Sequence, residues 1–346
     1  MMTASSDSAY AMSLRNLGWS DFFEDQRQGE DFAFDPCRIA SVHRSRLTAI
    51  SQTGPIRLAL PVRANTGDFA VGDWALVDPR THALHRRLTR KTLLERHNEG
   101  AKTSQLAAAN VDSLLIVTSC NADFNPARLE RYLALANQAG AHPVIVLTKV
   151  DATDDANVYR QKAATLQRGL PVVTLSPHSR DAATALAPWC GVGQTVALVG
   201  SSGVGKSTVV NVLAGTTPSP PQQTGEIREN DAKGRHTTTS RSIHAIAGGG
   251  WVIDTPGMRA LHVGSAAHGV GILFAEITEL APLCRFRDCT HDHEPGCAVQ
   301  AAVMSGTLDP ERLARWRKLV NENCRDTPSE KAPKAGGGAT ARSKKR

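Results

Sequence analysis

The chain has 346 residues, 41% of them hydrophobic, and a formal net charge of +7. That length allows about two or three domains with packed cores. No apolar run is long enough to span a membrane, and the polar first ten residues lack a signal-peptide core. We therefore expect a cytoplasmic protein with no membrane association. The positive charge favours a polyanionic partner, with nucleic acid ahead of an anionic membrane surface.

The first 36 residues mix serine, aspartate and glutamine with a few aromatic side chains. We interpret this segment as a partly disordered N-terminal extension with one short helix around Trp19 to Gln26. Its composition indicates no particular function.

Residues 37–100 are predicted to form a small β domain. Short apolar runs alternate with glycine, proline, asparagine and aspartate turns, at 38–42, 47–50, 56–62, 72–78 and 82–88. This count and size fit a five-stranded OB-type β-barrel. The segment is also rich in arginine, including Arg38, Arg44, Arg46, Arg57, Arg63, Arg86, Arg87 and Arg90. Arginines suit RNA phosphates, so we expect RNA contact here; the alternative is a structural barrel whose arginines face water.

Residues 101–262 alternate strands and helices, which is typical of a parallel sheet with helices on both faces. Ser113 to Ser119 is an apolar run that predicts a buried strand. The helix that follows has Asn125 as its N-cap, Pro126 in its first turn and Gly140 at its end. Further strands are expected at 144–147, 171–175, 195–199 and 250–253.

A phosphate-binding loop follows the strand at 195–199. Gly200 to Ser207 fits the pattern of glycine, four residues, glycine, lysine and serine, and residues 207–214 are expected to form the next helix. Glycines let the backbone N–H groups surround an anion, and the helix N-terminus adds partial positive charge. Lys206 is expected to reach the β- and γ-phosphates, while the Ser207 hydroxyl ligates Mg²⁺.

Thr148-Lys149-Val150-Asp151, at the end of another strand, matches a guanine-recognition motif. The Asp151 carboxylate can accept hydrogen bonds from guanine N1–H and the 2-amino group. Adenine offers no such pair of donors, so an ATP-driven enzyme is disfavoured. Lys149 is expected to lay its stem over the base. Ser176 then stands where a backbone contact to guanine O6 is expected.

Two segments after the phosphate loop are predicted to be switches. Gly234 to Thr239 fits a switch I segment in which one threonine of 237–239 senses Mg²⁺, with Thr238 taken as the ligand; the alternative is a polar lead-in to a hairpin. Asp254-Thr255-Pro256-Gly257 would hold Mg²⁺ through Asp254 and reach the γ-phosphate through the Gly257 N–H. Met258 stands where many GTPases place a water-orienting glutamine, so His236 is the candidate catalytic residue. The alternative is that His236 is an ordinary exposed histidine.

The order of these motifs is unusual, because the guanine motif precedes the phosphate loop in the chain. In ordinary GTPases it follows that loop. A parallel sheet accepts such a circular permutation when its original ends lie close together. The permutation also places the second switch directly before a C-terminal domain, which a γ-phosphate-dependent movement would displace.

The C-terminal region, residues 263–325, is predicted to be a small α-helical zinc-binding domain. Cys284, Cys289, His291 and Cys297 form a Cys₃His set suited to a structural tetrahedral Zn²⁺, with His293 as a competing ligand. Residues 310–321 form an expected helix with a candidate RNA-facing surface of Arg312, Arg315, Arg317 and Lys318. Residues 326–346 are expected to be a disordered basic tail.

Together these motifs resemble the RsgA (YjeQ/YloQ) family of circularly permuted GTPases that depend on the small ribosomal subunit. The resemblance covers Arg38 to about Asn321 and rests on the sequences at Val71–Trp74, Ala109–Asp112, Thr148–Asp151, Gly200–Thr208, His236–Thr239, Asp254–Gly257 and Cys284–Cys297. It implies an OB barrel, a permuted GTPase domain and a zinc domain. It also implies that the four ligands are Cys284, Cys289, His291 and Cys297, that His236 is the switch histidine, and that the small subunit stimulates hydrolysis. The motif begins with Thr148 where asparagine is commoner, and neither the N-terminal extension nor the basic tail belongs to the shared pattern.

The sequence therefore predicts a multidomain α/β GTPase that acts in late maturation of the small ribosomal subunit. We expect it to be a monomer that binds GTP or GDP, the small subunit and its rRNA, with one structural Zn²⁺ and with Mg²⁺ bound beside GTP. Water would attack the γ-phosphate directly, and the basal rate would be slow. The alternative is an RNA-binding protein of another pathway that uses GTP as a clamp with little hydrolysis. The predicted GTP-binding residues are Thr148, Lys149, Val150, Asp151, Ser176, Gly200, Ser201, Ser202, Gly203, Val204, Gly205, Lys206, Ser207, Thr208 and Gly257, and the predicted magnesium ligands are Ser207, Thr238 and Asp254.

Overall fold

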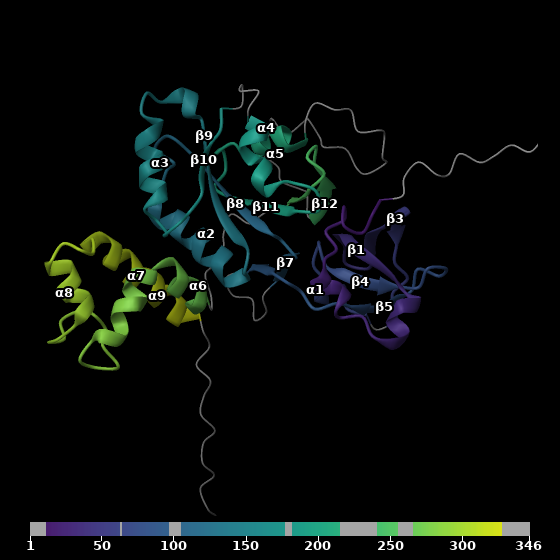
Figure 1. The fold of residues 1–346 in the computed structure, drawn as a ribbon, viewed down its shortest axis with the longest axis horizontal. Coiled ribbons are helices and arrows are strands. Elements are labelled where there is room, and N and C mark those ends of the chain that lie inside the picture. Colours follow the sequence, from purple (N-terminus) through teal and green to yellow (C-terminus); the bar gives the residue numbers. More distant parts are fainter. Residues whose placement is uncertain are drawn as a thin grey trace, which may run out of the picture.

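The computed structural model describes residues 12–62, 64–96, 105–176, 182–214, 241–254 and 266–326. A strand-rich N-terminal part, a central sheet with helices, and a helical C-terminal part follow one another across the molecule (Figure 1). The strands are β1 (Asp35–Val42), β2 (Leu47–Ser51), β3 (Gly54–Arg57), β4 (Trp74–Val77), β5 (Leu84–Arg87), β6 (Leu93–Arg96), β7 (Gln105–Ala109), β8 (Ser113–Ser119), β9 (His142–Thr148), β10 (Val172–Thr174), β11 (Thr195–Val199), β12 (Arg241–Ala245) and β13 (Trp251–Asp254). The α-helices are α1 (Asp21–Glu24), α2 (Pro126–Ala139), α3 (Ala156–Ala164), α4 (Ala182–Leu186), α5 (Lys206–Ala214), α6 (Ala267–Leu273), α7 (Ala275–Leu280), α8 (Ala298–Met304) and α9 (Pro310–Asp326).

The N-terminal strands pair in the order β3-β2-β1-β4-β5, all antiparallel. The two ends of this order meet at a parallel bridge between Ala59 and Ala83. There the Ala59 N–H donates to the His82 carbonyl at 2.8 Å, and the Leu84 N–H donates to the Ala59 carbonyl at 2.9 Å. Their buried residues form a small core of Cys37, Ile39, Leu47, Ala49, Leu58, Ala75 and Val77. This ring of pairings supports the predicted five-stranded barrel, whose OB type stays a prediction.

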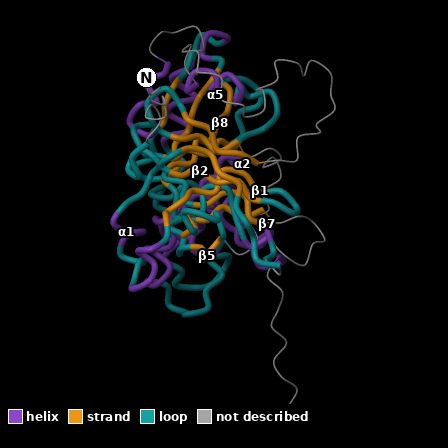
Figure 2. The backbone as a smooth tube through the Cα atoms, turned by 90° about the vertical axis from the view of Figure 1, so that its right-hand side faces the viewer, coloured by secondary structure: helices purple, strands orange, loops and turns teal. Residues whose placement is uncertain are grey.

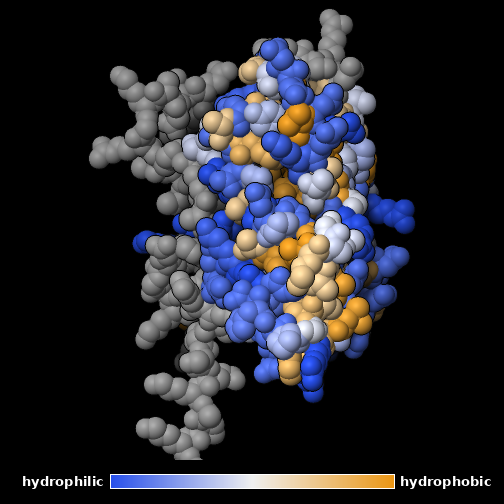
Figure 3. Space-filling view, turned by 90° about the vertical axis from the view of Figure 1, so that its left-hand side faces the viewer, coloured by the Kyte–Doolittle hydropathy of each residue, from blue (hydrophilic) through white to orange (hydrophobic). Residues whose placement is uncertain are grey.

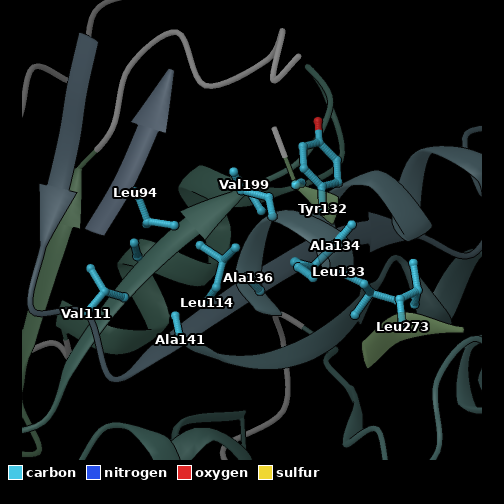
Figure 4. Packing of buried hydrophobic residues seen from close by; sticks show 14 of the residues in the cluster. Leu94, Val111, Leu114, Tyr132, Leu133, Ala134, Ala136, Ala141, Val199 and Leu273 are labelled. Carbon is cyan, nitrogen blue, oxygen red and sulfur yellow. The ribbon is translucent and has the colours of Figure 1, made fainter. Parts of the chain in front are cut away.

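The central sheet continues in the order β10-β9-β8-β11-β13-β12, parallel except for β12. Alternation along β8 shows how both faces are covered. Leu114 and Ile116 pack into the cluster that contains the apolar face of α2, whereas Leu115 and Val117 pack into the cluster that contains α4 and α5 residues. Figure 4 shows the first of these clusters, with Leu114 beside the residues of α2. The predicted parallel sheet with helices on both faces is confirmed.

Helix α2 begins and ends as its sequence predicts. The Asn125 side chain accepts a hydrogen bond from the Arg128 N–H, Pro126 lies in the first turn, and Gly140 adopts a left-handed conformation with φ 75°. A proline lacks the N–H that a helix start leaves unused, and glycine enters the left-handed region without a Cβ penalty. Both signals lie within the local sequence, so the helix ends could be read from it.

The N-terminal barrel and the central sheet are joined by strand pairing. Strand β1 pairs with β12 through Ser41–Ser242 and Val42–Arg241, so the strands of both parts form one continuous sheet. Figure 2 shows these strands following one another along the molecule. A smaller two-stranded sheet, β6 with β7, lies outside this continuous sheet.

The N-terminal segment from residue 12 packs into the seam between the two parts. Leu17 and Phe23 are buried in the core cluster that also contains Trp74 of the barrel and Ile253 of the central sheet. The buried Arg38 guanidinium donates to the Leu17 carbonyl and to the Thr195 hydroxyl, both at 2.6 Å. These contacts tie the segment to both parts at once. The short helix expected at 19–26 is reduced to α1, and residues 1–11 lie outside the described ranges.

The C-terminal helices dock on α2 through a buried ion-pair network. The Glu130 carboxylate of α2 accepts hydrogen bonds from Arg312 at 2.8 Å and Arg315 at 2.9 Å, both on α9. Arg317 of α9 pairs with Asp292 at 3.2 Å. The expectation that these arginines form an RNA-facing surface is therefore wrong for all three, because their guanidinium groups are used within the protein. Lys318 alone among the four is exposed.

The outer surface of the C-terminal part is mostly hydrophilic (Figure 3). Among its exposed apolar side chains are Leu283, Phe286 and Met304. None of the helices in the described ranges combines the length and the apolar character needed to cross a bilayer.

Candidate nucleotide site and metal centre

The phosphate loop connects β11 to α5, as its sequence predicts. Gly200, Gly203 and Gly205 have φ values of 144°, 78° and 92°, which L side chains rarely adopt. A Cβ on Gly200 would lie 2.2 Å from the Val117 carbonyl oxygen of β8. The loop therefore needs glycine both for its backbone conformation and for its close approach to the neighbouring strand. Because α5 begins at Lys206, the loop lies at a helix N-terminus.

Two cationic side chains contact Ser201 of this loop. The Lys206 ammonium donates to the Gly200 carbonyl at 2.8 Å and also to the Ser201 carbonyl. The Arg128 guanidinium, from the first turn of α2, donates to the Ser201 hydroxyl at 2.5 Å. Lys206 was predicted from the motif. Arg128 was not, because it is separated from the loop by 73 positions in sequence. The only sequence signal was its place in the first turn of a helix that follows a buried strand.

Thr148 connects the guanine motif to the phosphate loop. Its hydroxyl lies 2.5 Å from the Val204 carbonyl oxygen and 3.2 Å from the Thr118 carbonyl oxygen, so its single proton favours Val204. Thr148 is buried at the end of β9. A threonine at the first motif position therefore holds the base-binding and phosphate-binding segments together.

Lys149 and Asp151 follow Thr148 in a short turn. Lys149 adopts a left-handed conformation with φ 55°, and this bends the chain away from the strand into the 3₁₀ turn Val150–Ala152. The Asp151 side chain is exposed in that turn, where a base can reach it. Ser176 is the second residue after β10, and the preceding Leu175 N–H donates to the Leu147 carbonyl of β9 at 2.7 Å. The predicted base contacts therefore come from two neighbouring strand ends.

All these segments lie at the carboxyl ends of parallel strands, which is where open α/β sheets bind ligands. The strand order places β8 between β9, which carries the guanine motif, and β11, which carries the phosphate loop. The backbone of Asp254 ends β13, the strand next to β11. His236, Thr238 and Gly257 lie outside the described residues, so their predicted roles stay predictions.

A second candidate site gathers Cys284, Cys289, His291 and Cys297, whose ligand atoms all lie within 4.8 Å of one another. The His291 Nδ1 lies 3.5 Å from the sulfur atoms of both Cys284 and Cys297, and these two sulfurs are 3.8 Å apart. Three sulfurs and one imidazole nitrogen at such separations suit a tetrahedral zinc ion. His293, the competing ligand in the sequence, has a side chain that is 86% exposed and pairs with Asp292 at 3.5 Å.

The metal-site loop is organised by hydrogen bonds from outside the ligand set. The Glu294 carboxylate accepts the N–H groups of Thr290, Asp292 and His293 at 2.8 to 3.2 Å. The Gln300 side chain donates to the His291 carbonyl at 2.7 Å. These bonds fix the backbone that carries His291, which has an unusual positive φ of 60°. Such outer contacts orient metal ligands.

The pKa values of two thiols in the cluster are shifted in opposite directions, and burial raises that of Cys289 to about 12. Burial acts to raise the pKa of the Cys284 thiol, but hydrogen bonds from the backbone N–H groups of Ala298 and Val299, together with those from Cys297 and Cys289, hold that pKa below its ordinary value. Zinc binds the thiolate form, so a lowered pKa favours binding at neutral pH. The donor set therefore fits a structural zinc ion.

Comparison with known proteins identifies the family of this chain. A family model described as RsgA GTPase matches residues 87–264. A relative from Mesorhizobium japonicum, described as small ribosomal subunit biogenesis GTPase RsgA, is 65% identical over 338 residues, which cover 98% of each chain. A relative from Vibrio vulnificus, described as small ribosomal subunit biogenesis GTPase RsgA 2, is 45% identical and covers 91% of this chain and 89% of the relative.

Solved structures agree on the fold. YjeQ from Thermotoga maritima matches with a TM-score of 0.61 and 23% identity, covering 84% of this chain and 98% of that one. The circularly permuted GTPase YloQ matches with the same TM-score and identity, covering 87% and 99%. These two neighbours show that the chain shares their fold. From the family model and the 65% identical relative, the chain belongs to the RsgA GTPase family.

Proposed function

We propose that this chain is a GTPase that acts in the biogenesis of the small ribosomal subunit. The observation that carries the proposal is the Thr148–Val204 contact, which joins a guanine-recognition turn to a glycine-rich phosphate loop at one edge of the sheet. The names of the relatives, which describe small ribosomal subunit biogenesis GTPases, supply the process. The proposed GTP-binding residues are those expected from the sequence, at 148–151, 176, 200–208 and 257.

Nucleotide binding would divide between two groups of residues. The Asp151 carboxylate would accept the guanine N1–H and 2-amino protons, and Lys149 would cover the base. The loop amides of Gly200 to Ser207 would surround the phosphates, with Lys206 released from its loop carbonyls to bind the β- and γ-oxygens. Because hydrolysis is attack of water on the γ-phosphate, the contribution of these residues is positioning and charge stabilisation.

Two metal ions fit the residues present. Ser207, at the start of α5, has the hydroxyl that suits Mg²⁺ beside the phosphates, with Thr238 and Asp254 as the other proposed ligands. When bound, Mg²⁺ would neutralise charge on the β- and γ-phosphate oxygens. We assign a structural Zn²⁺ to Cys284, Cys289, His291 and Cys297, because the set is complete and offers no open position for substrate.

The barrel surface supports contact with ribosomal RNA. Its arginines divide into two groups in the structure. Arg38 is buried and Arg86 and Arg90 pair with Asp31 and Asp73, so these three act within the protein. Other arginines are exposed, including Arg44, Arg46 and Arg57, and the last two line a shallow hollow of about 400 Å³. Exposed arginines suit phosphate contacts. We expect the chain to act as a monomer in the cytoplasm, where ribosomes assemble.

The choice of nucleotide tests the guanine site. Wild type is expected to bind GTP and GDP far more tightly than ATP. Asp151→Asn removes an acceptor and places an N–H donor against guanine donors, so GTP affinity should fall by about 10²-fold or more. Thermal unfolding without nucleotide serves as the control, because Asp151 is exposed and its replacement should leave stability unchanged. Unaltered nucleotide choice in this variant would contradict the assignment.

Binding to ribosomal subunits tests the process. We expect the chain to co-sediment with small subunits in the presence of a non-hydrolysable GTP analogue and to dissociate with GDP. His236→Ala should keep this binding and lose subunit-stimulated hydrolysis if His236 is catalytic. Co-sedimentation with neither subunit, or equally with both, would contradict a role in small-subunit biogenesis.

A further inference from the structure

Arg128 differs from its neighbours on α2 in what its side chain does. Arg131, one turn later, makes a bidentate ion pair with Glu322 of α9 at 2.7 to 3.1 Å. Among the ion pairs between described residues, none involves Arg128. Its guanidinium instead reaches across to Ser201 in the phosphate loop. Its positive charge is therefore balanced by no ion pair among the described residues, and it lies beside the loop where phosphates would bind.

The backbone of Arg128 is fixed by the N-cap of α2. Its N–H donates to the Asn125 side chain at 3.0 Å, which closes the first turn of the helix. The helix itself is fixed at its centre by the buried Glu130 and by packing of Leu129, Leu133 and Ala136. Arg128 therefore extends from a rigid base towards a glycine-rich loop.

The glycine content of the phosphate loop explains why a contact that orders it would matter. Three of its eight residues are glycines with positive φ, and glycine loses more conformational freedom than other residues when it is fixed. Ligand binding must supply that ordering free energy unless the protein has already ordered the loop. The 2.5 Å bond from Arg128 fixes Ser201, the residue after Gly200, and Lys206 holds the carbonyls of the same two residues.

We propose that Arg128 is a positioning residue of the phosphate loop: it orders the loop through Ser201 and strengthens the binding of guanine nucleotides. The inference rests on the proposed GTPase function and adds to it a residue outside the motifs. Its action is on loop amides that contact phosphates shared by GTP and GDP. Both nucleotides should therefore lose affinity when the bond is removed, while the rate of hydrolysis at saturation changes little.

The test is a double-mutant cycle measured by nucleotide binding and turnover. Arg128→Ala and Ser201→Ala should each raise the Kd for GTP and for GDP about tenfold, the effect of one charge-assisted hydrogen bond. The double variant should also be about tenfold weaker, because both changes remove the same contact. The kcat of Arg128→Ala should stay within about twofold of wild type. Arg128→Lys keeps a charged donor and should recover about half of the loss on a logarithmic scale.

Arg131→Ala is the matched control, since it removes the same charge from the same helix but from a side chain that points to α9. Its Kd should stay within about twofold of wild type. Unchanged affinity in Arg128→Ala, or multiplied effects of about a hundredfold in the double variant, would overturn the inference alone. A wild-type chain that binds no guanine nucleotide would overturn the proposed function, and the inference with it.

Discussion

Replacing Glu130 with glutamine is expected to loosen the C-terminal helices from the GTPase core. Glu130 is 2% exposed and is the shared partner of Arg312 and Arg315, at 2.8 and 2.9 Å. The glutamine has nearly the same shape but no charge. The change therefore leaves two guanidinium groups at the α2–α9 contact without the carboxylate that balances them.

The free energy lost in Glu130→Gln depends on the ion pairs that Arg312 and Arg315 keep. Removing one partner of a buried ion pair costs about 3 to 5 kcal/mol. Arg312 keeps Glu276 at 2.8 Å, which is 37% exposed, and Arg315 keeps Glu311 at 3.7 Å, which is 86% exposed. Exposed pairs compensate little because water screens them. We therefore expect a loss at the lower end, about 3 kcal/mol, in the free energy that holds α9 closed.

Native-state hydrogen exchange of the α9 amides measures this free energy directly. A loss of about 3 kcal/mol corresponds to exchange about a hundredfold faster. Glu311→Gln is the control, since it removes an exposed carboxylate from the same network and should change the opening free energy by less than about 0.5 kcal/mol. Equal exchange rates in the two variants would refute the claim that the buried network holds the C-terminal helices.

Three further changes test other parts of the structure. Arg86 beside Asp31 holds the pKa of that carboxyl below its usual range, so the pair stabilises the protein above about pH 4 and is lost as the pH falls. Asp31→Asn should therefore lower the Tm at pH 7, and the difference from wild type should shrink in unfolding curves recorded at successively lower pH. Burial raises the pKa values of Cys37 and Cys190 to about 12, so both thiols should resist alkylation at pH 8 and react only on unfolding, as mass spectrometry would show. A Cβ on Gly269 would lie 2.0 Å from the Ala134 carbonyl oxygen, so Gly269→Ala should separate α6 from α2 and destabilise the protein by about 1 to 3 kcal/mol in urea unfolding. A Gly269→Ala protein as stable as wild type would contradict the close packing of these helices.

Structural features that depend on a short, contiguous stretch of residues could be predicted from the sequence. Strand β8 has the bounds expected from its apolar run, and α2 has the expected cap, proline and glycine. The phosphate loop and the metal cluster were also expected, because each depends on a short pattern of residues. Local sequence determines these elements, since their conformations depend on backbone preferences and on periodic burial.

Features that depend on distant partners could not be predicted. The basic side of α9 suggested an RNA surface because its neutralising residue, Glu130, lies 182 positions away from Arg312. The structural role of the N-terminal segment could not be predicted from its composition. Arg38 binds the backbone carbonyl of Leu17, a group that every residue type carries. The contact of Arg128 could not be predicted either, because its partner Ser201 lies 73 positions away. The roles of His236 and Thr238 stay predictions, since both lie outside the described residues.

GTP turnover measured with purified ribosomal subunits tests whether hydrolysis by this chain serves the small subunit. Phosphate release should be slow for the isolated protein, because Met258 cannot orient water, and should rise strongly with small subunits but not with large ones. No stimulation, or equal stimulation by both subunits, would show that hydrolysis does not serve the small subunit. Rapid turnover by the isolated protein would contradict the reasoning from Met258.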